Sequence, residues 1–257
     1  MKLPLFTTLI LVTVVFSGSL NAQQKKHIPV TKTRTAPVQK SGEIGQTAVV
    51  IDETLAVLRK NPSLFSESVH RMSRGRVVQI LGVTEADGVK FYRVTVPPKD
   101  FGWVQADAVF GKFRAGDEER LARLVQALDG FDQIEAAVKF FELYPNSSFR
   151  PSILLLFGDL LEGLSVKLSR DATNRLKRAE MAASAAPLHS YYLNFVSLDR
   201  YRKLGVVFLF NSAAKQFHYD GASWKEIVAK FPTSPEAAEA QKRLDALKVK
   251  MEKPTAK

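Results

Sequence analysis

Two kinds of hydrophobic pattern divide this chain. Between residues 56 and 109, hydrophobic and polar positions alternate along short runs, whereas beyond Asp117 hydrophobic positions recur at helical spacing. Alternation is typical of half-buried strands, and a spacing of about 3.6 residues is typical of a helix with one buried face. The pattern therefore predicts a mixed α+β fold, with a small β-domain at residues 44–112 followed by an all-α domain at residues 113–250.

The clearest strands flank an Asp-Gly pair. Residues 77–81 are rich in β-branched and aliphatic side chains, and residues 91–96 alternate between two sets, Tyr92, Val94 and Val96 against Phe91, Arg93 and Thr95. Asp87-Gly88 lies between the two runs, and Gly adopts positive φ at little steric cost, so a hairpin is expected here. Pro97-Pro98 ends the second strand because proline has no amide hydrogen to donate.

The same region resembles a bacterial SH3 (SH3b) domain. Its runs are Ala56-Val57-Leu58-Arg59-Lys60-Asn61-Pro62-Ser63, Gly75-Arg76-Val77-Val78-Gln79-Ile80-Leu81, Lys90-Phe91-Tyr92-Arg93-Val94-Thr95-Val96 and Gly102-Trp103-Val104-Gln105-Ala106-Asp107. The resemblance implies a small SH3-like β-barrel, partly open, that binds rather than catalyses. It also implies ligand contacts in the loop after Pro62 and near the barrel rim, on Phe65, Tyr92 and Trp103. For Trp103 a structural place in the barrel core or rim is the other interpretation, because the indole brings a large apolar face.

Beyond the β-domain, hydrophobic stripes predict antiparallel pairs of helices. The first helix has acidic residues at its amino end, where the helix dipole favours negative charge, and one apolar face made of Leu121, Leu124, Val125 and Leu128. Asp129-Gly130 ends it, and a second helix begins near Phe131 and stops at Pro145. Residues 153–164 are apolar almost all round, which predicts a central buried helix that is too short to span a membrane.

Two places in the α-domain resemble each other. Each is a helix that ends in aromatic-Pro and is followed by a polar cap: Phe140-Phe141-Glu142-Leu143-Tyr144-Pro145-Asn146-Ser147 and Ile227-Val228-Ala229-Lys230-Phe231-Pro232-Thr233-Ser234. We expect Ser234 to cap the next helix and Ser223 to open a capping box. These segments resemble tetratricopeptide-type repeats, but residues 165–221 show no repeat consensus, so the prediction is a degenerate helical-repeat-like array of α-α hairpins. The sequence His218-Tyr219-Asp220-Gly221 within that stretch is interpreted as a turn where a helix ends.

Composition adds an export signal and a linker. Residues 1–22 carry Lys2 near the start, continue with an apolar run and end in small residues, as in a secretory signal peptide, with a retained anchor as the alternative. Residues 23–43 carry scattered basic residues and almost no large apolar one, so a disordered linker is expected, as is a disordered tail at residues 251–257. The chain contains no Cys, which excludes disulfides and a lipidated cysteine, so we expect a periplasmic or secreted protein.

The chain is basic, with a formal net charge of +11. One expected helix gathers several of the charges, and forms either a solvated face or a site for an acidic partner: Arg170, Arg175, Lys177 and Arg178. The basic linker suits anionic surfaces or acidic proteins, and charge by itself does not choose among them. Nucleic acid is not expected as a partner, because the export signal argues against it.

The residues offer little catalytic apparatus. A cysteine peptidase, a common neighbour of SH3b domains, is excluded because the chain has no Cys, and a serine nucleophile stays open only because serines are common. The His residues show no metal-binding spacing: His27, His70, His189 and His218. We therefore predict no catalytic residue, no metal and no cofactor.

These patterns together predict a non-enzymatic, exported binding or scaffold protein of the cell envelope. The barrel is expected to contact peptidoglycan peptides or a protein partner, and the helical array to hold a protein segment. The alternative is a cell-wall-active hydrolase, or a regulator of one, with an unrecognised active site.

Overall fold

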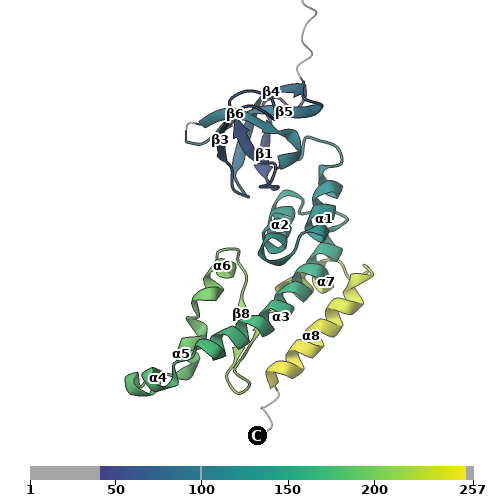
Figure 1. Ribbon diagram of the computed structural model, residues 1–257. Coiled ribbons are helices and arrows are strands. Elements are labelled where there is room, and N and C mark those ends of the chain that lie inside the picture. The colour runs from purple at the N-terminus through teal and green to yellow at the C-terminus, as the bar shows by residue number, and fades with distance from the viewer. Residues whose placement is uncertain (1–40, 99, 253–257) are drawn as a thin grey trace, which may run out of the picture. The chain divides into compact units, whose positions relative to one another are not determined.

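The computed structural model describes residues 41–98 and 100–252 (Figure 1). The predicted signal peptide, nearly all of the predicted linker and residues 253–257 of the predicted tail lie outside these residues. An antiparallel sheet forms the first part of the described chain and helices dominate the second, so the predicted α+β class is confirmed. Within residues 41–98 and 100–252, no helix has both the length and the apolar character that a membrane span requires.

The first part is a curled antiparallel sheet. Its strands are β1 (Thr47–Val50), β2 (Val57–Arg59), β3 (Ser68–Arg71), β4 (Val77–Ala86), β5 (Val89–Val96), β6 (Asp100–Gln105) and β7 (Val109–Phe110). They follow the order β3-β2-β6-β5-β4-β1-β7, which places β3 and β7 at the edges. Ser41, which the sequence assigns to the linker, belongs to a turn before β1, and neighbouring Glu43 binds Lys90 of β5 at 3.0 Å.

The predicted hairpin is confirmed. Asp87 and Gly88 both have positive φ, 54° and 72°, and they join β4 to β5, where Ile80 lies opposite Val94. This turn twists in the same sense as the strands that flank it. At Gly102 two strands approach closely, because a Cβ there would lie 2.8 Å from the carbonyl oxygen of Arg59 in β2.

Helices make up most of the second part. They are α1 (Asp117–Ala127), α2 (Gly130–Leu143), α3 (Arg150–Arg175), α4 (Arg178–Ser184), α5 (Leu188–Leu193), α6 (Asp199–Arg202), α7 (Ala222–Lys230) and α8 (Glu236–Glu252). The predicted break at Asp129-Gly130 separates α1 from α2. The central helix α3 is longer than the predicted 153–164, and its buried side chains follow one stripe along its whole length.

The all-α prediction for residues 113–250 is wrong in one place. A hairpin of β8 (Phe208–Asn211) and β9 (Gln216–Tyr219) stands between α6 and α7, so His218 lies in a strand rather than in a turn. Aromatic side chains favour strands when they can pack against a neighbouring surface. Here the ring of Phe217 is buried against Tyr192 at 5.9 Å, and Phe210 stacks on Tyr192 at 4.5 Å.

The two echoing segments form helical hairpins, α2–α3 and α7–α8, but their caps differ from the prediction. After Pro145, the hydroxyl of Ser147 accepts the amide of Phe149 at 3.0 Å, as a turn-forming serine does. Helix α7 begins at Ala222, whose amide donates to Asp220, so Ser223 lies inside the helix and the predicted capping box is wrong. The hydroxyl of Ser234 makes no hydrogen bond within the described residues.

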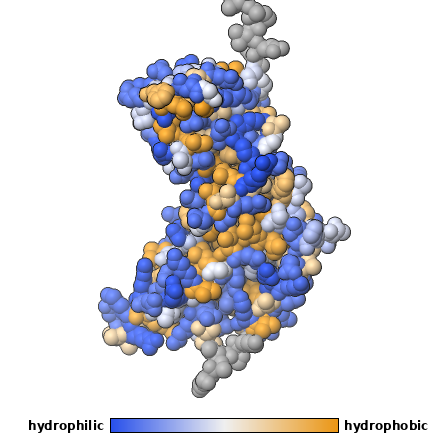
Figure 2. Space-filling model, turned by 45° about the vertical axis from the view of Figure 1, so that its right-hand side comes forward, coloured by the Kyte–Doolittle hydropathy of each residue, from blue (hydrophilic) through white to orange (hydrophobic). Residues whose placement is uncertain are grey.

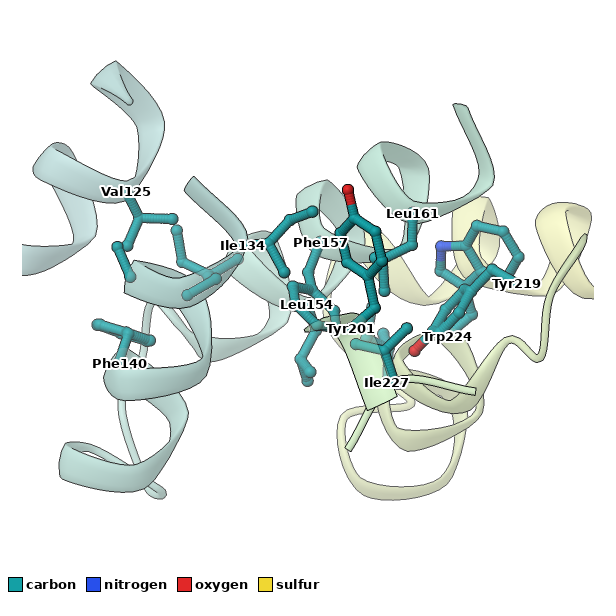
Figure 3. Close-up of a cluster of buried hydrophobic side chains, with 14 of the residues drawn as sticks. Val125, Ile134, Phe140, Leu154, Phe157, Leu161, Tyr201, Tyr219, Trp224 and Ile227 are labelled. Carbon is teal, nitrogen blue, oxygen red and sulfur yellow. The ribbon is translucent and has the colours of Figure 1, made fainter. Parts of the chain in front are cut away.

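The helical part has a continuous apolar core (Figure 3). Figure 3 shows side chains from α1, α2, α3, β9 and α7 meeting in it, including Ile134, Phe157 and Trp224. At the start of α1, buried Asp117 accepts hydrogen bonds from the Gly111 amide at 3.1 Å and from Arg114 at 2.6 Å. This carboxylate therefore fixes the turn that leads from β7 into the helices.

Candidate functional site

The strongest candidate site is on the outer face of the sheet, around Trp103. In β6 the buried residues Gly102 and Val104 alternate with Trp103, which is half-buried. Trp103 stands opposite Arg59 of β2 and opposite Arg93 of β5. Residues that face each other across antiparallel strands project to the same side, so Trp103 lies in a row between the side chains of two arginines.

The loop between β2 and β3 presents a second aromatic side chain. Phe65 is 90% exposed, more than any other large hydrophobic residue of the described chain. The loop around it is held by hydrogen bonds, because Asp87 accepts the hydroxyl of Ser63 at 2.7 Å and the amide of Leu64 at 2.8 Å. These bonds lower the pKa of Asp87, so the carboxylate stays charged and keeps the loop in place. A loop fixed by hydrogen bonds thus holds the exposed ring of Phe65 toward solvent.

Arg59 connects the loop to the Trp103 row. Its guanidinium donates to the carbonyl of Ser66 at 2.8 Å, and Ser66 directly follows Phe65. Phe101, two residues before Trp103 in β6, is 58% exposed and projects to the same side as Trp103 because side chains alternate along a strand. We call this surface the aromatic-basic face; its residues are Arg59, Phe65, Arg93, Phe101 and Trp103.

Tyr92 lies elsewhere. Its ring is fully buried on the core side of β5, opposite Val104, and packs edge-on against Phe113 at 6.4 Å. Burial raises the pKa of its hydroxyl. The structure therefore separates Tyr92 from Phe65 and Trp103, the other two predicted ligand contacts, and gives it a place in the core of the sheet.

The face also contains residues that the sequence did not single out. Phe101 could have been found, since strand alternation alone places it on the side of Trp103. Arg59 and Arg93 required the register of three strands that are not all adjacent in sequence. Figure 2 shows that hydrophobic patches interrupt a largely hydrophilic surface on the side it presents, so exposed apolar groups are not confined to one residue.

The His residues are not brought together. His70 lies 3.9 Å from Asp100, exposed His189 is in α5, and buried His218 contacts Glu162 at 3.0 Å. His27 lies outside the described residues. In the part of the chain that the structure describes, no group of three or more His, Cys, Asp or Glu residues is placed to hold a metal ion.

The predicted basic helix is divided. Arg170 and Arg175 belong to the end of α3, whereas Arg178 begins α4. Lys177 pairs with Glu180 at 2.9 Å in an exposed ion pair, and Arg175 lies over the ring of Phe195 at 5.9 Å. The four charges therefore do not form one surface stripe.

Comparisons with known proteins do not assign the chain to a family. No family model, no curated protein and no solved structure matches it. Its aromatic-basic face is therefore interpreted from its own chemistry. Two aromatic rings and a half-buried indole offer apolar contact, and the two guanidinium groups offer paired hydrogen bonds to carboxylates.

Proposed function

We propose that this chain is a non-enzymatic, exported binding protein of the cell envelope. In this proposal the sheet is an SH3b-like barrel, and its aromatic-basic face contacts peptidoglycan peptides. The observation that carries it is the placement of Trp103 between Arg59 and Arg93, beside a loop that exposes Phe65. Large aromatic residues and Arg are the side chains that most often dominate binding energy at interfaces.

The chemistry of the proposed ligand fits this face. A stem peptide of peptidoglycan offers small methyl groups and free carboxylates. Arg binds a carboxylate through two parallel hydrogen bonds, and an aromatic ring covers methyl groups with little loss of conformational entropy. Arg93 is exposed and Arg59 is half-buried, so at least one guanidinium is open to a ligand.

The composition of the first 40 residues supports export. They contain six of the 37 Lys and Arg residues and none of the 26 acidic residues of the chain. A signal peptide followed by a basic segment of this kind favours anionic envelope surfaces, where local positive charge raises the encounter rate with acidic polymers.

Helix packing supports a degenerate tetratricopeptide-like array. The hairpins α2–α3 and α7–α8 both break at a proline, Pro145 and Pro232, and α3 packs against α7 as consecutive repeats do. The segment between them, residues 176–221, then becomes an insertion, which accounts for the long sequence separation of the two echoes.

Retention on purified sacculi tests the barrel proposal. The mature protein should co-sediment with sacculi, and Trp103→Ala and the charge reversal Arg93→Glu should each reduce retention at least tenfold, about 1.4 kcal/mol. Arg93 is exposed, so its variant should remain folded by circular dichroism even if Trp103→Ala does not. Tyr92→Phe is the matched control, because this ring is in the core and should not affect retention.

Two outcomes would overturn the proposal. The first is that the native protein does not sediment, and the second is that Arg93→Glu sediments as well as the native chain. Soluble muropeptides released from the sacculi, measured in the same supernatants, would instead support a cell-wall hydrolase.

A further inference from the structure

A second surface, in the helical part, has the form of a binding groove. Its volume is about 320 Å³, and it opens between α2, α3, the start of α7 and the segment that joins α6 to β8. Phe141, Phe157 and Tyr219 form one wall, with ring centroids 5.5 Å apart for Phe141 and Phe157 and 6.4 Å apart for Phe157 and Tyr219. Apolar side chains complete the lining: Val138, Leu154, Leu204 and Val206.

The groove is small and apolar enough to take one large side chain. Its volume is at the lower end of the range for ligand sites, about 300–1,000 Å³. Edge-on aromatic pairs such as those of its wall leave ring edges and faces free for a further ring. Figure 3 labels three of the lining residues, Leu154, Phe157 and Tyr219, within the core of the helical part.

One hydroxyl group of the groove lining, that of Tyr219, keeps its proton for a ligand. Ser223 also lines the groove, but its Oγ is buried beside Gly158 of α3, where a Cβ on that glycine would lie 2.6 Å from it. The hydroxyl of Tyr219 accepts the amide of Ser223 at 2.8 Å, and burial raises the pKa of this phenol, so its own proton stays available near neutral pH. A buried donor without a partner is costly, so an acceptor such as a peptide carbonyl satisfies a need of this site.

The groove lining contains two carboxylates, of which Glu142 is open to a further cation. Glu142 and Glu226 line it, and no Lys or Arg is among the lining residues. Burial acts to raise the pKa of Glu226, but the contacts from Arg150 and Lys230 outweigh it and lower that pKa. This carboxylate is therefore charged, and it already pairs with Arg150 at 2.8 Å and with Lys230 at 3.3 Å. The Glu142 side chain is 56% exposed and pairs with Lys139 of its own helix, and a pair so exposed to solvent leaves the carboxylate open to another cation.

We propose that this groove holds a partner peptide that inserts a Phe or Leu side chain flanked by Lys or Arg. The apolar side chain fills the aromatic pocket, a backbone carbonyl accepts from the hydroxyl of Tyr219, and a flanking cation meets Glu142. The inference rests on the proposed function only in treating the helical array as the part that holds a protein segment. It does not depend on sacculus binding by the sheet.

Synthetic peptides and amide NMR test the assignment. The probe is acetyl-Gly-Lys-Phe-Lys-Gly-amide, added to the ¹⁵N-labelled mature protein. Saturable shifts are expected at the Gly205 and Ser223 amides and at the indole of Trp224, whose ring contacts Tyr219 at 5.5 Å. The peptide with Ala in place of Phe should cause no shift, and the one with Glu in place of both Lys residues should bind at least fivefold more weakly.

A blocked groove provides the decisive variant. Ala222 is an exposed lining residue, so Ala222→Arg should reduce peptide affinity at least tenfold by filling the groove with positive charge. Ala229→Arg is the matched control, because Ala229 is exposed on the same helix and is not among the lining residues.

The proposal is overturned if the Phe peptide causes no shifts, if the shifts map to the sheet, or if Ala222→Arg binds as tightly as Ala229→Arg. Sacculus retention of both variants is measured in parallel. If the protein binds sacculi but not the peptide, the groove proposal alone is rejected. If it binds the peptide but not sacculi, the proposal for the aromatic-basic face alone is rejected.

Discussion

Replacing Glu162 tests most directly what holds the β8–β9 hairpin against the helices. It lies in α3 with its side chain 16% exposed, and it joins three segments that are distant in sequence. One oxygen accepts Lys250 at 2.7 Å and contacts His218 Nδ1 at 3.0 Å, while the other accepts the Tyr219 amide at 2.9 Å. The same Lys250 offers its carbonyl to Asn211 at 3.0 Å, so the end of α8 is tied to the hairpin as well.

The pKa of Glu162 gives the size of the effect. Burial acts to raise it, but the hydrogen bonds from His218, Lys250 and the Tyr219 amide outweigh burial and lower the pKa from 4.5 to about 2. At 1.36 kcal/mol for each pKa unit, the charged form stabilises the fold by about 3 kcal/mol. Because the folded-state pKa lies below the unfolded-state value, this contribution is complete above pH 4.5 and is lost as the pH falls toward 2.

Urea denaturation of the native protein and of Glu162→Gln, followed by circular dichroism at several pH values, measures this. We expect the variant to be less stable by about 3 kcal/mol near pH 7, and the difference to shrink as the pH falls below 4.5. Glu180→Gln is the control, because Glu180 forms only an exposed pair with Lys177, and its replacement should change little at any pH.

A stability difference that stays constant from neutral pH to pH 3 would refute the reasoning, because a constant loss reports packing rather than charge. An equally stable Glu162→Gln at neutral pH would show that the three contacts do not hold the hairpin.

Two further replacements test the junction and the helix packing. Asp117→Asn should destabilise the protein by about 3 kcal/mol in urea, because it leaves buried hydrogen-bond donors and two arginines without their anion. The control is Asp107→Asn, which should cost little because the Asp107 side chain is 63% exposed beside the same arginines. Equal losses of stability in the two variants would contradict this. Gly158→Ala should lower the free energy of unfolding by about 1–3 kcal/mol, since its Cβ would lie 2.3 Å from Trp224 Nε1. Gly163→Ala on the same helix is the control: its Cβ meets nothing within 4 Å, so it should stabilise the protein by about 0.5–1 kcal/mol. Thermal unfolding measures both, and a stable Gly158→Ala would show that α3 and α7 pack less closely than described.

The parts of the fold that the sequence predicts are those with strong local signals. The β4–β5 hairpin combines alternation with an Asp-Gly turn, and both signals agree with the observed pairing. The break between α1 and α2 coincides with Gly130, which has positive φ. In each case a residue with special backbone freedom stands at the point where the chain changes direction.

The missed hairpin β8–β9 lacks such a signal. Its turn contains no Gly; instead the side chain of Asn211 accepts the amides of Ala213 and Ala214, and Lys215 adopts a φ of 56°. Its strands have four residues each and do not alternate clearly in burial. What fixes them is tertiary, since the Phe217 amide donates to the hydroxyl of Ser169 in α3 at 2.7 Å.

The candidate site was likewise predicted from the sequence only in part. Trp103 could be singled out by residue type, but the arginines beside it depend on the pairing of β2, β6 and β5. Tyr92 was placed with the ligand contacts because of the family resemblance, although alternation already grouped it with Val94 and Val96, which are buried. For Tyr92, the alternation of hydrophobic positions predicts the observed burial, whereas the family resemblance does not.

In the proposed helical-repeat array, residues 176–221 form an insertion between the two helical hairpins, and the same residues supply one side of the proposed groove. Leu204, Val206 and Tyr219 all belong to residues 176–221, and they supply the side of the groove that faces α2 and α3. A regular array without this segment would pack α3 against α7 but would lack the Tyr219 ring and its hydroxyl. The stretch that breaks the repeat pattern is therefore the stretch that builds the groove, and Glu162, by holding the adjacent strand, links the stability of the hairpin to the shape of that site.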